Sequence, residues 1–131
     1  MTPLLEVIAC SVADAVEAEK GGANRLEIVR DLQRGGMTPP LELVAEIRQA
    51  VDLPLRVMLR ERESYETSGD HETSVDDETR GDGEMSGREE FVRLCAAARQ
   101  FASLGVDGFV LGFLKGGEVD VERTTRVLAC A

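Results

Sequence analysis

The chain alternates between short apolar runs rich in β-branched residues and longer segments in which apolar residues recur at helical spacing. This strand-then-helix pattern occurs four times, and it is typical of parallel strands with helices packed outside them. The predicted pairs are residues 4–10 with 11–20, 25–30 with 39–51, 55–60 with 87–104, and 109–114 with 121–131. Four such units are half of a (β/α)8 barrel of the TIM type, which usually takes about 250 residues. The predicted fold class is therefore α/β: a half-barrel with a parallel sheet, in one domain over residues 1–131.

Polar residues and glycines mark where the predicted helices begin and end. Ser11 and Ser86 stand where a side-chain oxygen caps a helix N-terminus. Thr38 followed by Pro39 predicts a capped helix with proline in its first position. The pair Gly21–Gly22 is expected to end the first helix, because glycine adopts the left-handed conformation found at helix ends.

Residues 61–90 differ from the rest of the chain in charge. They hold 12 Asp and Glu against three Arg, whereas the whole chain has a net charge of −10. With few apolar side chains, such a segment buries too little surface to offset the entropy of ordering it. We therefore expect residues 61–90 to form a mobile acidic insertion after the third strand. A lid over a site and a solvated insertion without function both remain open.

Alternate residues of a strand point to opposite faces, and here the two faces differ. The face expected under the helices is apolar, whereas the face expected inside the barrel carries Glu6, Glu27 and Arg60. Charges inside a fold are costly unless they are paired or used. These three are the candidate catalytic residues: Glu6 or Glu27 as acid–base, and Arg60, at the carboxyl end of its strand, as a clamp for an anion. A structural ion network is the alternative.

Composition excludes several classes of partner. The net charge of −10 argues against nucleic acid and against an anionic membrane surface. No apolar run approaches the roughly 20 residues of a membrane span, and the start of the chain lacks the features of a secretion signal. Three cysteines, an odd number, argue against a disulfide framework and favour a reducing cytoplasm. Cys95 is expected in the core and Cys130 at an exposed helix end.

Several segments together resemble the CutC copper-homeostasis family. The resemblance covers everything except residues 61–90, and it is carried by residues 5–15, 19–27, 32–39, 53–60, 105–112 and 117–122. Two of the most specific segments are Leu-Gln-Arg-Gly-Gly-Met-Thr-Pro at 32–39 and Gly-Val-Asp-Gly-Phe-Val-Leu-Gly at 105–112. The resemblance implies a TIM-type barrel, a cytoplasmic location and an association with copper tolerance. It implies no defined reaction.

The chain departs from that family at two positions where the family typically has cysteine. Ile8 and Val29 stand there, and neither side chain can bind a metal. Cu(I) prefers thiolate and thioether ligands. Cys10 lies two residues beyond Ile8 on the same predicted face, and Met58 faces inward from the third strand. Cys10 and Met58 are therefore the candidate copper ligands.

Three hypotheses for function remain open at this point. The first is a cytoplasmic copper-homeostasis protein that binds Cu(I) weakly; the second is a barrel enzyme acting on a small anionic molecule. The third is an incomplete barrel without activity of its own. Because the first and fourth strands are open edges of a parallel sheet, which invite pairing with another chain, we also expect a homodimer or higher oligomer.

Overall fold

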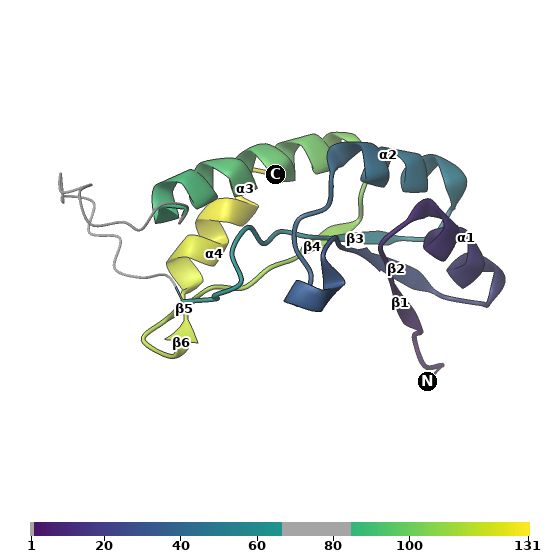
Figure 1. The fold of residues 1–131 in the computed structure, drawn as a ribbon, viewed down its shortest axis with the longest axis horizontal. Helices are drawn as coiled ribbons and strands as arrows, with labels where there is room; N and C mark the ends of the chain where they lie inside the picture. The colour runs from purple at the N-terminus through teal and green to yellow at the C-terminus, as the bar shows by residue number, and fades with distance from the viewer. Residues whose placement is uncertain (1, 67–84) are drawn as a thin grey trace.

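The computed structural model describes residues 2–66 and 85–131, and it confirms the α/β half-barrel. Four parallel strands form one sheet in the order β1-β2-β3-β4, so that every strand lies beside its neighbour in sequence (Figure 1). The strands are β1 (Glu6–Ala9), β2 (Arg25–Ile28), β3 (Leu55–Met58) and β4 (Gly108–Val110). In the described part of the chain, β1 and β4 are the two edges of this sheet.

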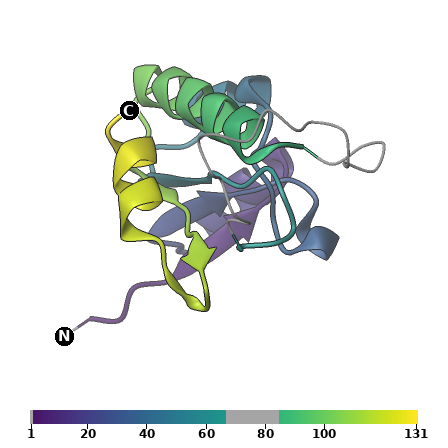
Figure 2. The ribbon, with the colours of Figure 1, turned by 90° about the vertical axis from the view of Figure 1, so that its left-hand side faces the viewer.

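The helices lie along one side of the sheet. They are α1 (Val12–Lys20), α2 (Leu41–Ala50), α3 (Gly87–Ser103) and α4 (Val121–Leu128), with a short 3-10 turn, η1 (Leu32–Arg34), after β2. Figures 1 and 2 show α1, α2 and α3 above the sheet and α4 beside α3, whereas η1 lies on the other side. One face of the sheet is therefore covered, and the face that would line a barrel is left open, whereas parallel sheets are usually covered on both faces.

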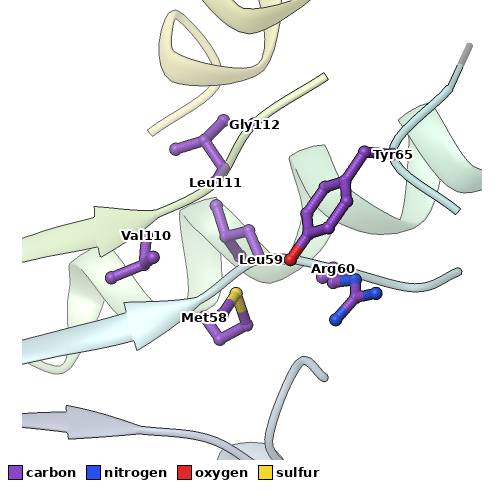
Figure 3. Close-up of a pocket in the computed structure, with 7 residues that line it drawn as sticks. All are labelled: Met58, Leu59, Arg60, Tyr65, Val110, Leu111 and Gly112. Atoms are coloured by element: carbon purple, nitrogen blue, oxygen red, sulfur yellow. The ribbon is translucent and has the colours of Figure 1, made fainter. Parts of the chain in front are cut away.

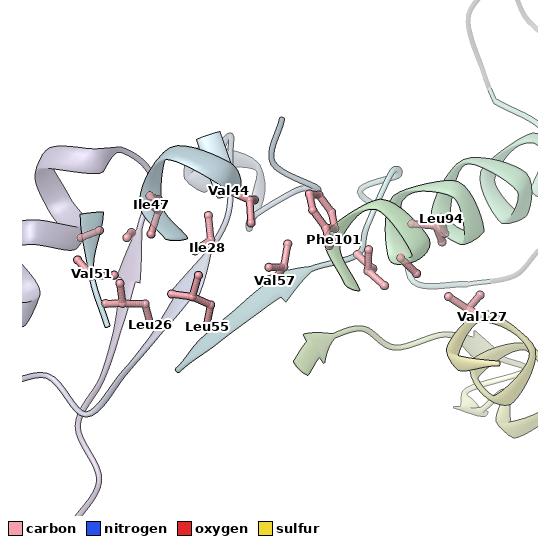
Figure 4. Packing of buried hydrophobic residues seen from close by; sticks show 14 of the residues in the cluster. Leu26, Ile28, Val44, Ile47, Val51, Leu55, Val57, Leu94, Phe101 and Val127 are labelled. Atoms are coloured by element: carbon pink, nitrogen blue, oxygen red, sulfur yellow. The ribbon is translucent and has the colours of Figure 1, made fainter. Parts of the chain in front are cut away.

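The core lies between the sheet and these helices (Figure 4). Leu26, Ile28, Leu55 and Val57 point from β2 and β3 toward α2 and α3, and each is fully buried. This confirms the predicted apolar face of both strands. The prediction fails at Leu5, which is 51% exposed because β1 begins only at the next residue.

Two of the three predicted helix caps are confirmed. The Ser11 hydroxyl accepts a hydrogen bond from the Asp14 amide at 3.1 Å, and the Ser86 hydroxyl accepts one from the Glu89 amide at 3.0 Å. The third prediction is wrong: α2 begins at Leu41 with Pro40 in the cap position. The Thr38 hydroxyl is unavailable as a cap because it hydrogen-bonds both backbone groups of Arg60.

The fourth unit departs most from expectation. The predicted strand over 109–114 ends at Val110, and Leu114–Lys115 pairs instead with Glu118–Val119 as the small antiparallel hairpin β5–β6. Gly116 and Gly117 make its turn with φ of +59° and +81°, values that glycine adopts without strain. The last helix is also shorter than residues 121–131, because α4 ends at Leu128.

Only the two ends of the acidic segment 61–90 are among the described residues; residues 67–84 lie outside them. Both described ends pack on the body of the protein. The guanidinium of Arg62 contacts the carboxylate of Glu90, which is 3% exposed. The carbonyl of Tyr65 accepts a 2.7 Å hydrogen bond from the Leu114 amide, which joins the segment to β5.

The expectation of no disulfide is also wrong. Cys95 on α3 and Cys130, just beyond α4, form a disulfide with 5.2 Å between their Cα atoms. Cys95 is buried, as expected, and Cys130 is half-buried rather than exposed. Cys10 is the free cysteine of the described chain. Nothing in the cysteine spacing indicated this pair, because 35 residues separate the two positions.

Candidate functional site

The open face of the sheet is built from rows of residues on neighbouring strands. The register pairs Glu6 with Arg25, Glu27 with Arg56, and Met58 with Val110. One end of this face is therefore charged. Toward the carboxyl ends of the strands this face carries apolar or sulfur-containing residues. Extending the register by one residue places Cys10, Val29, Met58 and Val110 in one row across the sheet.

Two predicted site residues meet at the charged end. Glu6 forms an ion pair with Arg25 on the neighbouring strand. Glu27 lies near Glu6, and its pKa is raised, first by burial and then by the charge of Glu6 and a side-chain hydrogen bond to it. Burial and a neighbouring like charge both penalise ionised Glu27. A raised pKa keeps the Glu27 carboxyl protonated to a higher pH, which suits the predicted acid–base role.

The raised pKa predicts how stability depends on pH. A carboxyl whose pKa is higher in the folded than in the unfolded chain favours folding fully below its unfolded pKa, and this contribution is lost as the pH rises through the folded pKa. We therefore expect Glu27→Gln to be more stable than the parent at pH 7, by less than about 1 kcal/mol because solvent screens the site. The gap should vanish below about pH 4.

Urea denaturation across this pH range measures the gap. Glu46→Gln is the matched control, because it removes one carboxylate from an exposed position of α2. A gap for Glu27→Gln that stays constant down to acid pH would show that the substitution acts through packing rather than charge.

A second arginine, Arg56, lies on β3, opposite Glu27 of β2 in the register of the sheet. A Cβ atom added at Gly108 would stand 2.6 Å from Nη1 of Arg56, so the guanidinium occupies the space that any side chain at Gly108 would need. The glycine opening β4 therefore admits a positive charge onto the open face. Arg25 is ion-paired with Glu6, and Arg56 stands opposite Glu27 in the register of the sheet.

Arg60 serves mainly to join two loops. Its guanidinium donates hydrogen bonds to the backbone carbonyls of Arg34, Gly36, Arg62 and Glu63. It also lies 4.3 Å from the centre of the Tyr65 ring. Arginine has five N–H donors, and four hydrogen bonds to carbonyls leave little of the group for an anion. The geometry therefore accounts for the 9% exposure of Arg60 without a ligand.

A small pocket opens beside Arg60 at the carboxyl ends of β3 and β4 (Figure 3). Its volume is about 190 Å³, and its lining residues are Met58, Leu59, Arg60, Tyr65, Val110, Leu111 and Gly112. Figure 3 shows the Tyr65 ring reaching toward Leu59 and Arg60. Ligand pockets usually measure about 300–1,000 Å³, so this one suits an ion or a very small molecule.

The structure separates the three predicted catalytic residues into two places. Glu27 is level with Arg56, and Arg60 lies four residues further along the chain, two residues beyond the end of β3. At about 3.3 Å per residue this offset is roughly 13 Å. Glu6 and Glu27 therefore form one group within strands β1 and β2, and Arg60 belongs to the pocket at the carboxyl ends.

The two candidate copper ligands share a row but not adjacent strands. Cys10 follows β1 and Met58 ends β3, with β2 between them. Strands about 4.8 Å apart place the two backbones roughly 10 Å from each other. Met58 lies close to Gly36, whose added Cβ would stand 3.6 Å from the methionine Cε. Methionine is long and flexible, so a shared ion requires its sulfur to reach across Val29.

The protonation of Cys10 also bears on metal binding. Burial raises the pKa of the Cys10 thiol, and the charge of Asp14 raises it further. The Asp14 carboxylate accepts a 3.0 Å hydrogen bond from the Cys10 amide, which fixes it nearby. Because a thiolate is the metal ligand, copper must displace this proton. Within residues 2–66 and 85–131, no three His, Cys, Asp or Glu side chains are grouped to hold a metal.

The sequence did not point to two residues that shape the pocket beside Arg60. Thr38 binds the backbone of Arg60 from the loop after β2, and Tyr65 covers its guanidinium from the acidic segment. Thr38 was assigned to a helix cap, which is the usual role of threonine before proline. Tyr65 carried a weak signal, because it is the chain's only tyrosine and it lies in an otherwise polar stretch.

A sequence model described as the CutC family matches residues 3–131. A family protein CutC of Xylella fastidiosa strain Temecula1 is 36% identical over 128 residues, which cover 97% of this chain and 41% of that protein. The human copper homeostasis protein cutC homolog is 34% identical over 96% of this chain and 40% of its own length. The chain thus spans less than half the length of these relatives.

Two solved structures resemble this fold. One is described as a putative copper homeostasis protein CutC from Streptococcus agalactiae, with a TM-score of 0.75 and 22% identity over 98% of this chain and 55% of that one. The other is described as a putative phosphonomutase from Burkholderia cenocepacia, with a TM-score of 0.54 and 22% identity over 98% of this chain and 46% of that one. At this identity both likenesses concern the fold alone. In the described part of our chain, no helix has the length and apolar character needed to cross a membrane.

Proposed function

Because the chain belongs to the CutC family, we propose that it acts in copper homeostasis in the cytoplasm and binds Cu(I) weakly. The observation that carries this proposal is the family match over nearly the whole chain, together with relatives named for copper homeostasis. The proposal concerns the copper ion as the cargo of the protein rather than as a resident cofactor.

The open face carries side chains of the chemical types that bind Cu(I). Cys10 and Met58 offer a thiol and a thioether, the soft ligands that Cu(I) prefers. Both lie at the carboxyl end of the sheet, in the row that also holds Val29 and Val110. Two donors separated by a strand, one with a raised pKa, fit a weak site whose affinity increases with pH.

We expect Cys10→Ser to weaken Cu(I) binding by more than about tenfold, because it removes the one thiolate that this face can supply. Met58→Leu should have a smaller effect, since it removes a weaker donor and keeps the volume. A titration against a competing Cu(I) chelator under reducing, oxygen-free conditions measures both affinities.

The double variant Cys95→Ser/Cys130→Ser is the control for this titration, because it removes the other two thiols of the chain. It should bind Cu(I) as the parent does. Affinity lost in the double variant and kept in Cys10→Ser would place the copper site at α3 and α4 instead.

A second candidate function is a barrel enzyme acting on a small anionic substrate. The position of the pocket favours it, because barrel enzymes of this type carry their chemistry at the carboxyl ends of the strands. The four hydrogen bonds from Arg60 to carbonyls speak against an anion bound by that guanidinium. The roughly 13 Å between Arg60 and Glu27 speaks against a single site that uses both. Shifts in the Leu111 and Gly112 amide signals on adding millimolar inorganic phosphate would favour this alternative. A barrel unit without activity of its own predicts neither phosphate nor copper binding.

A further inference from the structure

The disulfide between Cys95 and Cys130 joins α3 to the segment just after α4. Cys95 lies on the buried face of α3, and Cys130 lies two residues beyond the end of α4. The Cα separation of 5.2 Å is well within the range that a disulfide spans. The bond therefore fixes the last residues of α4 against α3 without requiring the backbone to move.

The other contacts of α4 are uneven along its length. Its first half is held by Arg123, which donates a 2.6 Å hydrogen bond to the Gly87 carbonyl and lies 5.3 Å from the Phe113 ring. In its second half the Arg126 guanidinium lies 4.8 Å from the centre of the Phe91 ring and Val127 is fully buried, whereas Leu128 is 46% exposed. Beyond Val127, the disulfide is the main buried tie between the end of α4 and α3.

The two sulfur-bearing residues differ in their access to solvent. Cys95 is 4% exposed, and Cys130 is half-buried. A small thiolate from solvent therefore reaches the sulfur of Cys130 first. Partial access to the sulfur of Cys130 favours exchange there, because exchange requires direct attack on a sulfur atom.

The fold can also accommodate Cys95 and Cys130 as reduced thiols. The sulfur of Cys130 lies 3.4 Å from the carbonyl oxygen of Arg126, one helical turn earlier. A reduced Cys130 thiol can donate its S–H to that oxygen. Reduced Cys95 remains on the apolar face of α3, where free cysteine behaves as a small apolar residue. Neither redox state therefore leaves Cys95 or Cys130 as a buried polar group without a partner.

We propose that Cys95 and Cys130 are a thiol–disulfide exchange site for a small cellular thiol of the glutathione class, which couples the attachment of α4 to the redox state. In the reducing direction, the thiolate of the small molecule attacks Sγ of Cys130, and Sγ of Cys95 leaves as a thiolate and takes up a proton. A second small thiol then attacks the mixed disulfide. This releases Cys130 as a thiol and the small molecule as its own disulfide.

This site does not depend on copper, and it explains a pair of cysteines for which the proposed copper function has no use. It also reconciles a disulfide with the expected cytoplasmic location, because disulfides of cytosolic proteins are usually transient and responsive to redox conditions.

The test equilibrates the whole chain in buffers with different ratios of reduced to oxidised glutathione, followed by acid quenching, alkylation and peptide mass analysis. We expect one free thiol per chain, that of Cys10, under oxidising conditions, and three free thiols under reducing conditions, with a reversible transition. Hydrogen exchange should become about tenfold faster over residues 121–131 on reduction and stay unchanged in β2 and β3.

Two single variants test the direction of attack. Cys95→Ser should accumulate glutathione on Cys130, whereas Cys130→Ser should leave Cys95 unmodified because it is buried. The proposal is overturned if the linked peptide never forms at the most oxidising ratio, or if the link opens only after the chain is unfolded. Equal modification of the two cysteines would overturn the proposed attack on Cys130. The titration of the parent chain decides the main point even if a variant fails to fold.

Discussion

Replacing Glu90 by glutamine is expected to lower the free energy of unfolding by about 3 kcal/mol, the largest loss that we expect from any single charge in the described chain. Glu90 is 3% exposed in the first turn of α3. Its carboxylate contacts the guanidinium of Arg62 and lies 3.9 Å from Nη2 of Arg123. Removing the carboxylate leaves two largely buried positive charges without their shared counter-charge.

The position of Glu90 makes this result informative about the fold. Arg62 comes from the segment after β3, and Arg123 comes from α4. One carboxylate therefore joins three parts of the chain that are far apart in sequence. Denaturant unfolding of Glu90→Gln against Glu46→Gln, an exposed carboxylate on α2, isolates the effect of burial. Equal stability of the two variants would contradict the buried network.

The second large effect concerns assembly. We propose that the 131-residue chain by itself forms a dimer or a larger oligomer at micromolar concentration. The edge strand β1 has little protection: Ile8 within it is 45% exposed, and Leu4 and Leu5 just before it are 60% and 51% exposed. Unpaired edges pair readily with other chains. Two copies that join β4 to β1 twice would rebuild an eight-stranded barrel with two-fold symmetry.

Light scattering after size-exclusion chromatography tests this by comparing the mass with the 14.2 kDa of one chain. Leu5→Lys places a charge beside the β1 edge and should shift the protein toward the monomer. Val92→Lys is the control, because Val92 is 59% exposed on α3, away from both edges. A compact, cooperatively unfolding monomer of the parent chain would contradict the proposed pairing.

Most of the fold was predictable because its signals are local. The period of two in β2 and β3 identified the residues that pack under the helices, and Leu26 and Val57 confirm it. Ser11 and Ser86 cap their helices because each bond spans only three residues. Thr38 shows the limit of this reasoning, since a bond to Arg60, 22 residues away, takes the hydroxyl from its local role.

The candidate site was predictable only in part. Alternation correctly indicated that Glu6 and Glu27 share a face, and the structure adds that they approach closely enough to raise the pKa of Glu27. The same alternation placed Arg60 on that face together with Glu6 and Glu27. Its place in another group, with its donors used by backbone carbonyls, depends on where the loops after β2 and β3 run.

The sequence by itself determined the order of strands and helices, the apolar face of the sheet, and membership of the CutC family, because periodicity, capping and motifs act over a few residues. Only the tertiary structure decided which distant side chains meet. Cys95 with Cys130, Glu90 with Arg62, and Arg60 with the Gly36 carbonyl all join segments whose approach no local pattern encodes. The physical reason is that burial and pairing energies belong to contacts between elements, and these contacts exist only after the helices have packed on the sheet.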